Sequence, residues 1–247
     1  MQAEISYIFH NCFVLKLNRK TFLFDYPSDN YLSENIRNVL QAKIQNSDLY
    51  ILASHNHQDH FNRNISELAA NTRKTTYILS KDIIKKNRSF ETMADCFCVA
   101  PDQSYRINDL EIYTFRSNDQ GVAFLICCNG LNIYFGGDLA NWDWGNLTAQ
   151  EHRLLVDYFA EVLTKLKQRP VQIAFSNTDP RLNNWAGAAQ FIDTIKPNLF
   201  VPMHTFGETQ AISRFLAEHP QPVTGFFQYH QTGDTITLEF PDLEEDV

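Results

Sequence analysis

The stretch LYILASHNHQDH, residues 49–60, is the most informative part of this sequence. Its apolar start is typical of a buried strand, and the strand leads directly into a polar segment that holds three of the chain's eight histidines and one aspartate. An H-x-H-x-D-H string arises by chance in roughly 6 × 10⁻⁴ of shuffled chains with these His and Asp frequencies. Side chains at the carboxyl end of a strand are well placed for chemistry. The stretch therefore predicts a metal site at a strand end.

The spacing of the donors indicates two ions. His55 and His57 flank a single residue and can direct two neutral imidazoles to one ion. Asp59 and His60 offer a hard oxygen and a nitrogen to a second ion nearby. A solvated loop or a helix cap formed by Asp59 would explain one histidine, but it does not explain four clustered donors.

Two further donors stand at predicted strand ends. Asp138 follows the strand LNIYFGG, residues 131–137, and His204 ends the strand NLFVPMH, residues 198–204. A binuclear site needs a bridging carboxylate and additional ligands from outside the main motif. We expect both residues to be ligands, rather than a capping aspartate and a core histidine.

Composition limits the class of protein. The chain has 247 residues, of which 44% are hydrophobic and 20% charged, as in globular proteins. Its net charge, 21 − 29 = −8, argues against a broad basic surface, so nucleic acid is not an expected partner. The start MQAEISYIFH lacks a signal-peptide pattern, and the longest apolar run, residues 122–128, is too short to cross a membrane. We expect a cytoplasmic, unexported protein whose five cysteines are buried and reduced.

Apolar runs separated by turn residues predict the fold. Three strands open the chain and are followed by alternating helices and strands, and the part from residue 105 repeats this order. Two similar halves, with sheets face to face and helices outside, predict an α/β fold of the four-layer αββα sandwich type. The expected strands cover residues 4–10, 12–18, 21–25, 49–54, 75–80, 97–99, 105–107, 110–115, 121–128, 131–137, 171–177, 198–204 and a final pair, 224–230 and 235–240, that turns at Gly233; the expected helices cover residues 32–45, 64–70, 82–87, 149–167, 185–195 and 208–218.

With its HxHxDH motif after a strand, its later Gly137-Asp138 pair and its final histidine, the sequence resembles the metallo-β-lactamase superfamily. The resemblance covers nearly the whole chain, so we expect one domain of this fold over residues 1–247. Within the family, GVAFLICCNGLNIYFGGDL, VPMHTFGE and TGDTITL look most like the branch that includes relatives of L-ascorbate-6-phosphate lactonase. The resemblance implies metal ligands at His55, His57, Asp59, His60 and His204, a bridging ligand at Asp138, and a supporting role for Asp25, which ends the strand FLFD and holds the histidine loop.

One departure from the family pattern concerns the number of metals. The family's middle histidine should lie just before Gly121, where this chain reads RSNDQG, residues 116–121. Asp119 could supply the missing ligand, and Asn118 or Ser117 could do so less well, although an aspartate before glycine is also ordinary in a turn. The outcome is an altered two-metal site, a single-metal site or an inactive relative. We expect one or two divalent ions, with Zn first and Mn or Fe(II) as harder alternatives.

These features predict a metal-dependent hydrolase for a small-molecule ester, lactone or phosphoester. The ions would activate a shared water for attack on a carbonyl or phosphoryl centre, with Asp59 and Asp138 as the catalytic carboxylates. Two alternatives stay open: a catalytically degenerate metal-binding or sensor domain of the same fold, and a nuclease. A homo-oligomer is also compatible with the sequence.

Four more side chains are candidates for contact with the ligands or the substrate. Trp142 and Trp144 lie in the loop after Asp138, where they could wall a substrate pocket or cover the edge of the core. Asp179 could bind substrate, hydrogen-bond a ligand histidine or form an Asp-Pro turn. Arg181 could meet an anionic substrate or be an isolated surface residue.

Overall fold

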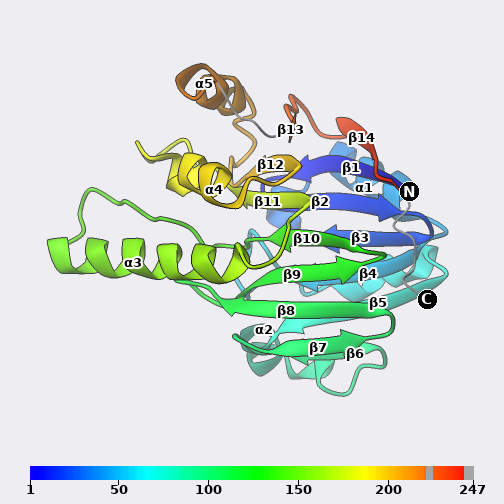
Figure 1. Cartoon of the computed structure of the whole chain (residues 1–247). Coiled ribbons are helices and arrows are strands. Elements are labelled where there is room, and N and C mark those ends of the chain that lie inside the picture. The colour runs from blue at the N-terminus through cyan, green and yellow to red at the C-terminus, as the bar shows by residue number, and fades with distance from the viewer. Residues whose placement is uncertain (221–224, 242–247) are drawn as a thin grey trace. The chain divides into compact units, whose positions relative to one another are not determined.

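The computed structural model describes residues 1–220 and 225–241 (Figure 1). The chain forms two compact units. The first unit comprises Met1–Val99 and Tyr229–Val247, and the second comprises Ala100–Gln228. In the described residues, each unit is built on one seven-stranded mixed sheet with helices beside it. That all of residues 1–247 form a single domain stays a prediction.

The sheet of the first unit has the strand order β14-β1-β2-β3-β4-β5-β6. Its strands β1, β2 and β3 form antiparallel pairs, and β3, β4, β5 and β6 then pair in parallel. The parallel arrangement places the carboxyl ends of β3 and β4 at the same edge of the sheet. The strands are β1 (Gln2–Phe9), β2 (Cys12–Leu17), β3 (Lys20–Phe24), β4 (Asp48–Ala53), β5 (Lys74–Ser80), β6 (Cys96–Val99) and β14 (Thr235–Glu239).

Helices α1 (Glu34–Ile44) and α2 (Lys81–Lys86) cover part of this sheet. In α1 the side chain of Ser33 caps the amino terminus by accepting a hydrogen bond from the backbone N–H of Ile36. Leu40 and Ile44, one helical turn apart, are buried in the same apolar cluster as strand residues such as Ile51. Short 3-10 helices cover Asp29–Tyr31, Ile65–Asn71 and Arg88–Phe90.

The second unit repeats this plan with the strand order β13-β12-β11-β10-β9-β8-β7. Antiparallel pairing from β7 to β10 is followed by parallel pairing from β10 to β13, and Asn129-Gly130 forms the predicted β9–β10 hairpin with positive φ at both residues. The carboxyl ends of β10, β11 and β12 thus share an edge. The strands are β7 (Ser104–Ile107), β8 (Leu110–Arg116), β9 (Val122–Cys128), β10 (Leu131–Phe135), β11 (Ile173–Asn177), β12 (Leu199–Met203) and β13 (Gly225–Phe226).

The helices of the second unit are α3 (Ala149–Leu166), α4 (Ala188–Ile195) and α5 (Gln210–Glu218), with a 3-10 turn over Trp185–Gly187. Thr148 and Glu151 form a capping box at the start of α3, which satisfies two backbone N–H groups of its first turn. The apolar faces of these helices bury Phe159, Phe191 and Phe215 in one cluster with the strands. None of the described helices is long and apolar enough to cross a membrane.

The predicted fold class is confirmed, with two corrections. The segments predicted as a final hairpin belong to different sheets: β13 pairs in parallel with β12, whereas β14 pairs antiparallel with β1, and residues 221–224 lie outside the described residues. Residues 185–187 are not part of a long helix, because Trp185, Ala186 and Gly187 have positive φ and cannot continue a right-handed helix.

The cysteines are all free, but they are not all buried. Cys12 and Cys128 are buried as expected, whereas Cys98 is exposed. Cys98 lies on β6, a strand at the edge of its sheet, where one side of the strand has no neighbour in the described sheet.

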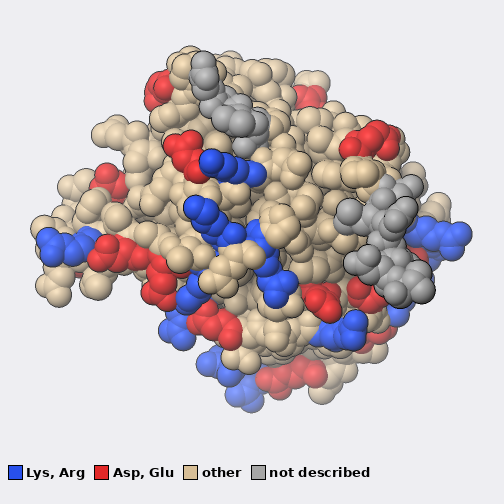
Figure 2. Space-filling model, viewed as in Figure 1, with Lys and Arg blue, Asp and Glu red and all other residues tan. Residues whose placement is uncertain are grey.

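Charged side chains of both signs are interspersed on the face shown in Figure 2. Exposed ion pairs include Lys165 with Glu161, at 2.7 Å, and Arg106 with Glu111, at 3.8 Å. Pairs of this kind contribute little to stability, because solvent screens them. The acidic stretch at residues 242–246 lies outside the described residues.

Replacement of Gly187 by alanine tests the turn before α4. Gly187 has φ +83°, and a Cβ there would lie 2.7 Å from the Cβ of Asn141. We expect Gly187→Ala to lower the free energy of unfolding by about 1–3 kcal/mol in urea denaturation. Gly145→Ala is the control, because nothing lies within 4 Å of its Cβ position. Equal stability of the two variants would contradict this account.

Candidate metal centre

The histidine loop of the first unit begins where β4 ends. Asp25 directly follows β3, the parallel neighbour of β4, and its backbone N–H donates to the carbonyl of Leu52 at 2.9 Å. The backbone N–H groups of His60 and Phe61 both donate to the carbonyl of His57, which closes a turn. This topology brings Asp25 and the histidine loop together at one sheet edge.

The Asp25 carboxylate holds this loop in place through hydrogen bonds. Oδ1 accepts the backbone N–H of Ser54 at 2.7 Å, and Oδ2 accepts the Ser54 hydroxyl at 2.7 Å and lies 2.7 Å from Nδ1 of His60. All three side chains are buried. Burial raises the pKa of the Asp25 carboxyl, and the hydrogen bonds from His60 and Ser54 offset only part of that rise.

These contacts set the orientation of two imidazoles. The Ser54 hydroxyl donates its single proton to Oδ2 of Asp25, so the Ser54 oxygen accepts from Nδ1 of His55, 2.9 Å away. Nε2 of His55 then carries a lone pair and faces Nδ1 of His57 at 2.9 Å. Likewise, when Nδ1 of His60 donates to Asp25, the lone pair of the neutral ring is on Nε2. A metal-binding histidine is typically oriented in this way, by an oxygen at its other ring nitrogen.

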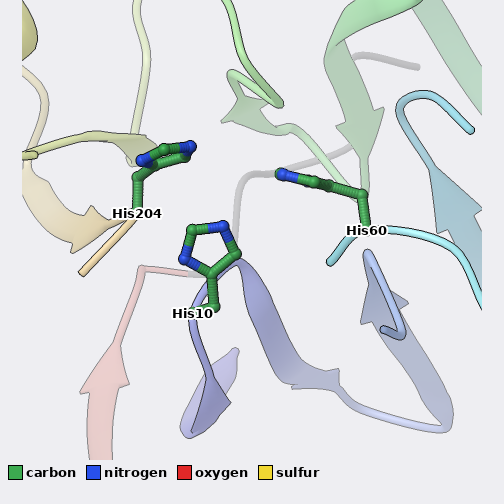
Figure 3. A group of neighbouring side chains, drawn as sticks. All are labelled: His10, His60 and His204. Atoms are coloured by element: carbon green, nitrogen blue, oxygen red, sulfur yellow. The ribbon is translucent and has the colours of Figure 1, made fainter. Parts of the chain in front are cut away.

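Asp59 lies beside two imidazoles of the first unit. Its Oδ2 is 3.7 Å from Nε2 of His60 and 3.6 Å from Nε2 of His10, and its side chain is 20% exposed. Figure 3 shows His10 at the turn between β1 and β2. Sequence reasoning gave His10 no metal role. The strand order could have indicated that His10 lies near the histidine loop, because the β1–β2 turn and the carboxyl ends of β3 and β4 lie at the same sheet edge.

In the second unit, a tight turn presents Asp138. Gly137 has φ +52°, and the side-chain amide of Asn177 donates to the carbonyls of Gly137, at 2.9 Å, and Leu139, at 3.2 Å. Asn177 ends β11, which is next to β10 in the sheet. The amide therefore clamps the backbone on both sides of Asp138. Sequence reasoning missed Asn177, because nothing in its spacing marks it.

His204 follows β12 and lies between two carboxylates. Its Nδ1 is 3.0 Å from Oδ2 of Asp179, and its Nε2 is 3.5 Å from Oδ1 of Asp138. Among the roles considered for Asp179, the structure shows the hydrogen-bond contact with His204, which is a predicted ligand. Burial alone would raise the pKa of the Asp179 carboxyl, but hydrogen bonds from His204 and Arg181 outweigh burial and lower the pKa to about 2.

Arg181 is not an isolated surface residue. Its guanidinium contacts both carboxylate oxygens of Asp179, with Nε at 2.9 and 3.1 Å. It also lies over the rings of Phe206, at 4.8 Å, and Trp144, at 5.3 Å. The arginine therefore holds Asp179 in place and connects it to aromatic side chains.

The two tryptophans stack next to His204. Trp142 and Trp144 have centroids 5.8 Å apart and are nearly parallel, and the Trp142 ring is 5.1 Å from that of His204. The Trp142 indole N–H donates to the backbone carbonyl of Asp138 at 2.9 Å. Trp142 is buried, so it both covers core and borders His204.

Asp119 is exposed and lies in the turn after β8. Its backbone N–H donates to the Ser117 hydroxyl at 3.1 Å, as in an ordinary turn, and a carboxylate oxygen of Asp119 comes within 4.8 Å of one of Asp138. Asn118 is turned to the loop after Asp138, where its side chain exchanges hydrogen bonds with the backbone of Ala140. Of the three oxygen donors considered for this turn, Asp119 is thus placed near a predicted ligand.

Comparison with known families identifies the class. The sequence matches the Beta-lactamase superfamily domain over residues 4–204, and the chain belongs to this family. Its two mixed sheets with flanking helices are those of the metallo-β-lactamase fold. A comparison with curated proteins finds no match.

Solved structures show the same fold at low sequence identity. Igni18, a metallo hydrolase from the hyperthermophilic archaeon Ignicoccus hospitalis, is 13% identical with a TM-score of 0.62, over 97% of this chain and 100% of that one. The metallo-beta-lactamase fold protein YhfI from Bacillus subtilis is 12% identical with a TM-score of 0.64, over 96% and 99%. CmlA, a diiron beta-hydroxylase from Streptomyces venezuelae, is 15% identical with a TM-score of 0.57, over 96% of this chain and 54% of that one. The fold thus occurs with different reactions.

Removal of the Asp25 carboxylate tests its role in the first unit. We expect Asp25→Ala to lower the free energy of unfolding of the metal-free chain by about 3 kcal/mol, because buried polar groups of Ser54 and His60 lose their acceptor. Urea denaturation measures this change. The control is Asp48→Ala, which removes an exposed carboxylate 3.2 Å from Arg73 and should cost less than about 1 kcal/mol. A similar small loss in both variants would refute the anchoring role.

Proposed function

We propose that this protein is a metal-dependent hydrolase that acts on a small-molecule ester, lactone or phosphoester. The observation that carries the proposal is the orientation of its imidazoles. In both units a buried carboxylate holds Nδ1 of a histidine, Asp25 for His60 and Asp179 for His204, and thereby leaves Nε2 as the ligand atom. Histidines with a purely structural role would not need a buried carboxylate at Nδ1 in both units.

The donor set fits divalent metal ions. It combines neutral imidazoles with carboxylates, the ligands typical of Zn, Mn and Fe(II) sites in proteins. We propose one or two ions, Zn first, bound by His55, His57, Asp59, His60, Asp119, Asp138 and His204. When bound, such an ion supplies Lewis acidity and lowers the pKa of a coordinated water toward neutrality.

The protein's own residues would position the reactants. Asp59 is partly exposed beside His60, so its carboxylate can accept a hydrogen bond from the attacking water and orient it. Trp144 is partly exposed and offers a flat apolar surface for the substrate, and the buried Trp142, which borders His204, supports its ring by stacking.

A cavity beside the histidine loop supports a small polar substrate. It has a volume of about 540 Å³, which is in the range of small-molecule sites, and it is lined by His57 together with polar side chains of the first unit. The amides among these are Asn30, Asn56, Gln58, Asn62 and Asn64. Such amides can donate to and accept from hydroxyl, carbonyl or phosphoryl oxygens. The sequence resemblance to lactonase relatives is the reason to include lactones.

Metal content is the first test of the proposal. Protein purified without chelator and reloaded with Zn, Mn or Fe(II) should contain close to two ions per chain by elemental analysis. Asp119→Ala should bring the content toward one, because it removes an oxygen donor that stands where the family has a histidine. Metal near zero after reloading would contradict the proposal, and an unchanged content in Asp119→Ala would remove Asp119 from the ligand set.

Hydrolysis is tested with a panel of chromogenic esters, lactones and phosphodiesters. We expect turnover that needs metal and falls at least about 100-fold in Asp59→Asn, which keeps the side-chain shape but loses the charge. Full metal loading without any turnover favours the non-hydrolytic sensor instead. Cleavage of RNA or DNA by the loaded protein would favour the nuclease.

The Asp179 carboxylate should also affect metal affinity. Asp179→Ala leaves Nδ1 of His204 without its acceptor, and we expect a 10- to 100-fold weaker affinity for Zn in competition with a chromogenic chelator. The control is Asp193→Ala, which removes an exposed carboxylate on α4 of the same unit. Equal Zn affinity of both variants would show that Asp179 does not support a ligand.

A further inference from the structure

His10 is a buried histidine in a constrained backbone. It follows β1 at the turn into β2, has φ +52° and is fully buried, and the pairing of the two strands shifts register between Tyr7 and Phe9. Its backbone N–H donates to the hydroxyl of Tyr7 at 3.3 Å. Histidine tolerates positive φ better than most residues, but the conformation still costs free energy. The position is thus fixed by the surrounding structure.

The imidazole of His10 and that of His60 approach the same carboxylate oxygen. Nε2 of His10 lies 3.6 Å, and Nε2 of His60 3.7 Å, from Oδ2 of Asp59. The two rings are 5.2 Å apart with an edge-to-face angle of 73°, and in Figure 3 a nitrogen of each points into the space between them. One ring nitrogen of His10 lies within 4.8 Å of a ring nitrogen of His60.

These distances suit ligands of one ion better than a hydrogen bond. A hydrogen bond from an imidazole N–H to a carboxylate spans about 2.7–3.2 Å. Two ligands that are each about 2.0–2.1 Å from an ion lie about 3.3–3.6 Å apart when the angle at the ion is between tetrahedral and trigonal. The 3.6 Å separation of His10 from Asp59 is at the upper end of this second range, and the 3.7 Å separation of His60 from Asp59 is just above it.

We propose that Nε2 of His10 is a third protein ligand, from the first unit, of the ion that Asp59 and His60 bind. The inference rests on the metal centre of the proposed function and extends its ligand set. Two imidazoles and one carboxylate form a donor set that holds Zn or Fe(II) and keeps further coordination positions open. His10 thereby supplies a nitrogen donor in a chain that lacks the family's middle histidine.

Co(II) binding to the full chain tests this ligand. A His57→Ala background weakens the other proposed site, so that the remaining ion reports on Asp59 and His60. His10→Asn and His10→Gly are made in this background, because asparagine and glycine both accept positive φ. Co(II) affinity, the visible absorption spectrum and the imidazole count from X-ray absorption are measured, and far-ultraviolet circular dichroism checks the fold. His230→Ala is the control, because it removes an exposed imidazole of the same unit.

Loss of a residue that only hydrogen-bonds a metal ligand lowers metal affinity roughly 10- to 100-fold. We expect the Co(II) affinity of both His10 variants to fall by more than this, and the number of imidazoles on Co(II) to fall by one. Free imidazole should restore the spectrum of His10→Gly by filling the vacated space. His230→Ala should match its parent. An unchanged imidazole count in folded His10→Asn overturns the ligand assignment, whether or not the affinity falls. If the wild-type chain binds neither Co(II) nor Zn, the proposed function itself fails, which is a different result.

Discussion

The buried carboxylate of Asp25 is the interaction on which the histidine loop of the first unit depends. It accepts hydrogen bonds from the backbone and hydroxyl of Ser54 and from Nδ1 of His60. Without these donors, a fully buried carboxylate would be strongly unfavourable. The same bonds fix the loop after β4 and, through Ser54, the ring of His55. The stability of the loop and the orientation of its histidines therefore have one physical origin.

The second unit uses the same arrangement on a different pair of strands. Asp179 lies just beyond β11 and His204 just beyond β12, and these strands are parallel neighbours, as β3 and β4 are in the first unit. In each unit, a carboxylate beyond one strand orients an imidazole beyond the next. Arg181 adds a cation that lowers the cost of the charge on Asp179. Rings held in this way lose little entropy when they bind a ligand, which is the benefit of preorganisation.

How much could be predicted from the sequence differs between residues. The order of strands and helices and the turn at Asn129-Gly130 follow from local patterns, since they depend on neighbours along the chain. The contact of Asp179 with His204 was one of several interpretations. For Arg181, the two interpretations were contact with an anionic substrate and an isolated surface position, and neither gave Asp179 as its partner. A side chain's partner depends on which strand ends are adjacent in the sheet. His10 was passed over for the same reason, as its carboxylate neighbour, Asp59, is far away in sequence.

The sequence by itself determined the class of this protein, because the donors of the HxHxDH motif and the alternation of strands and helices are local properties of the chain. Tertiary structure alone decided that β13 and β14 join different sheets, since strand pairing is settled by long-range contacts. It also decided which ring nitrogen of His60 and His204 contacts a carboxylate, because a distant aspartate, and no feature of the motif, accepts a hydrogen bond from Nδ1.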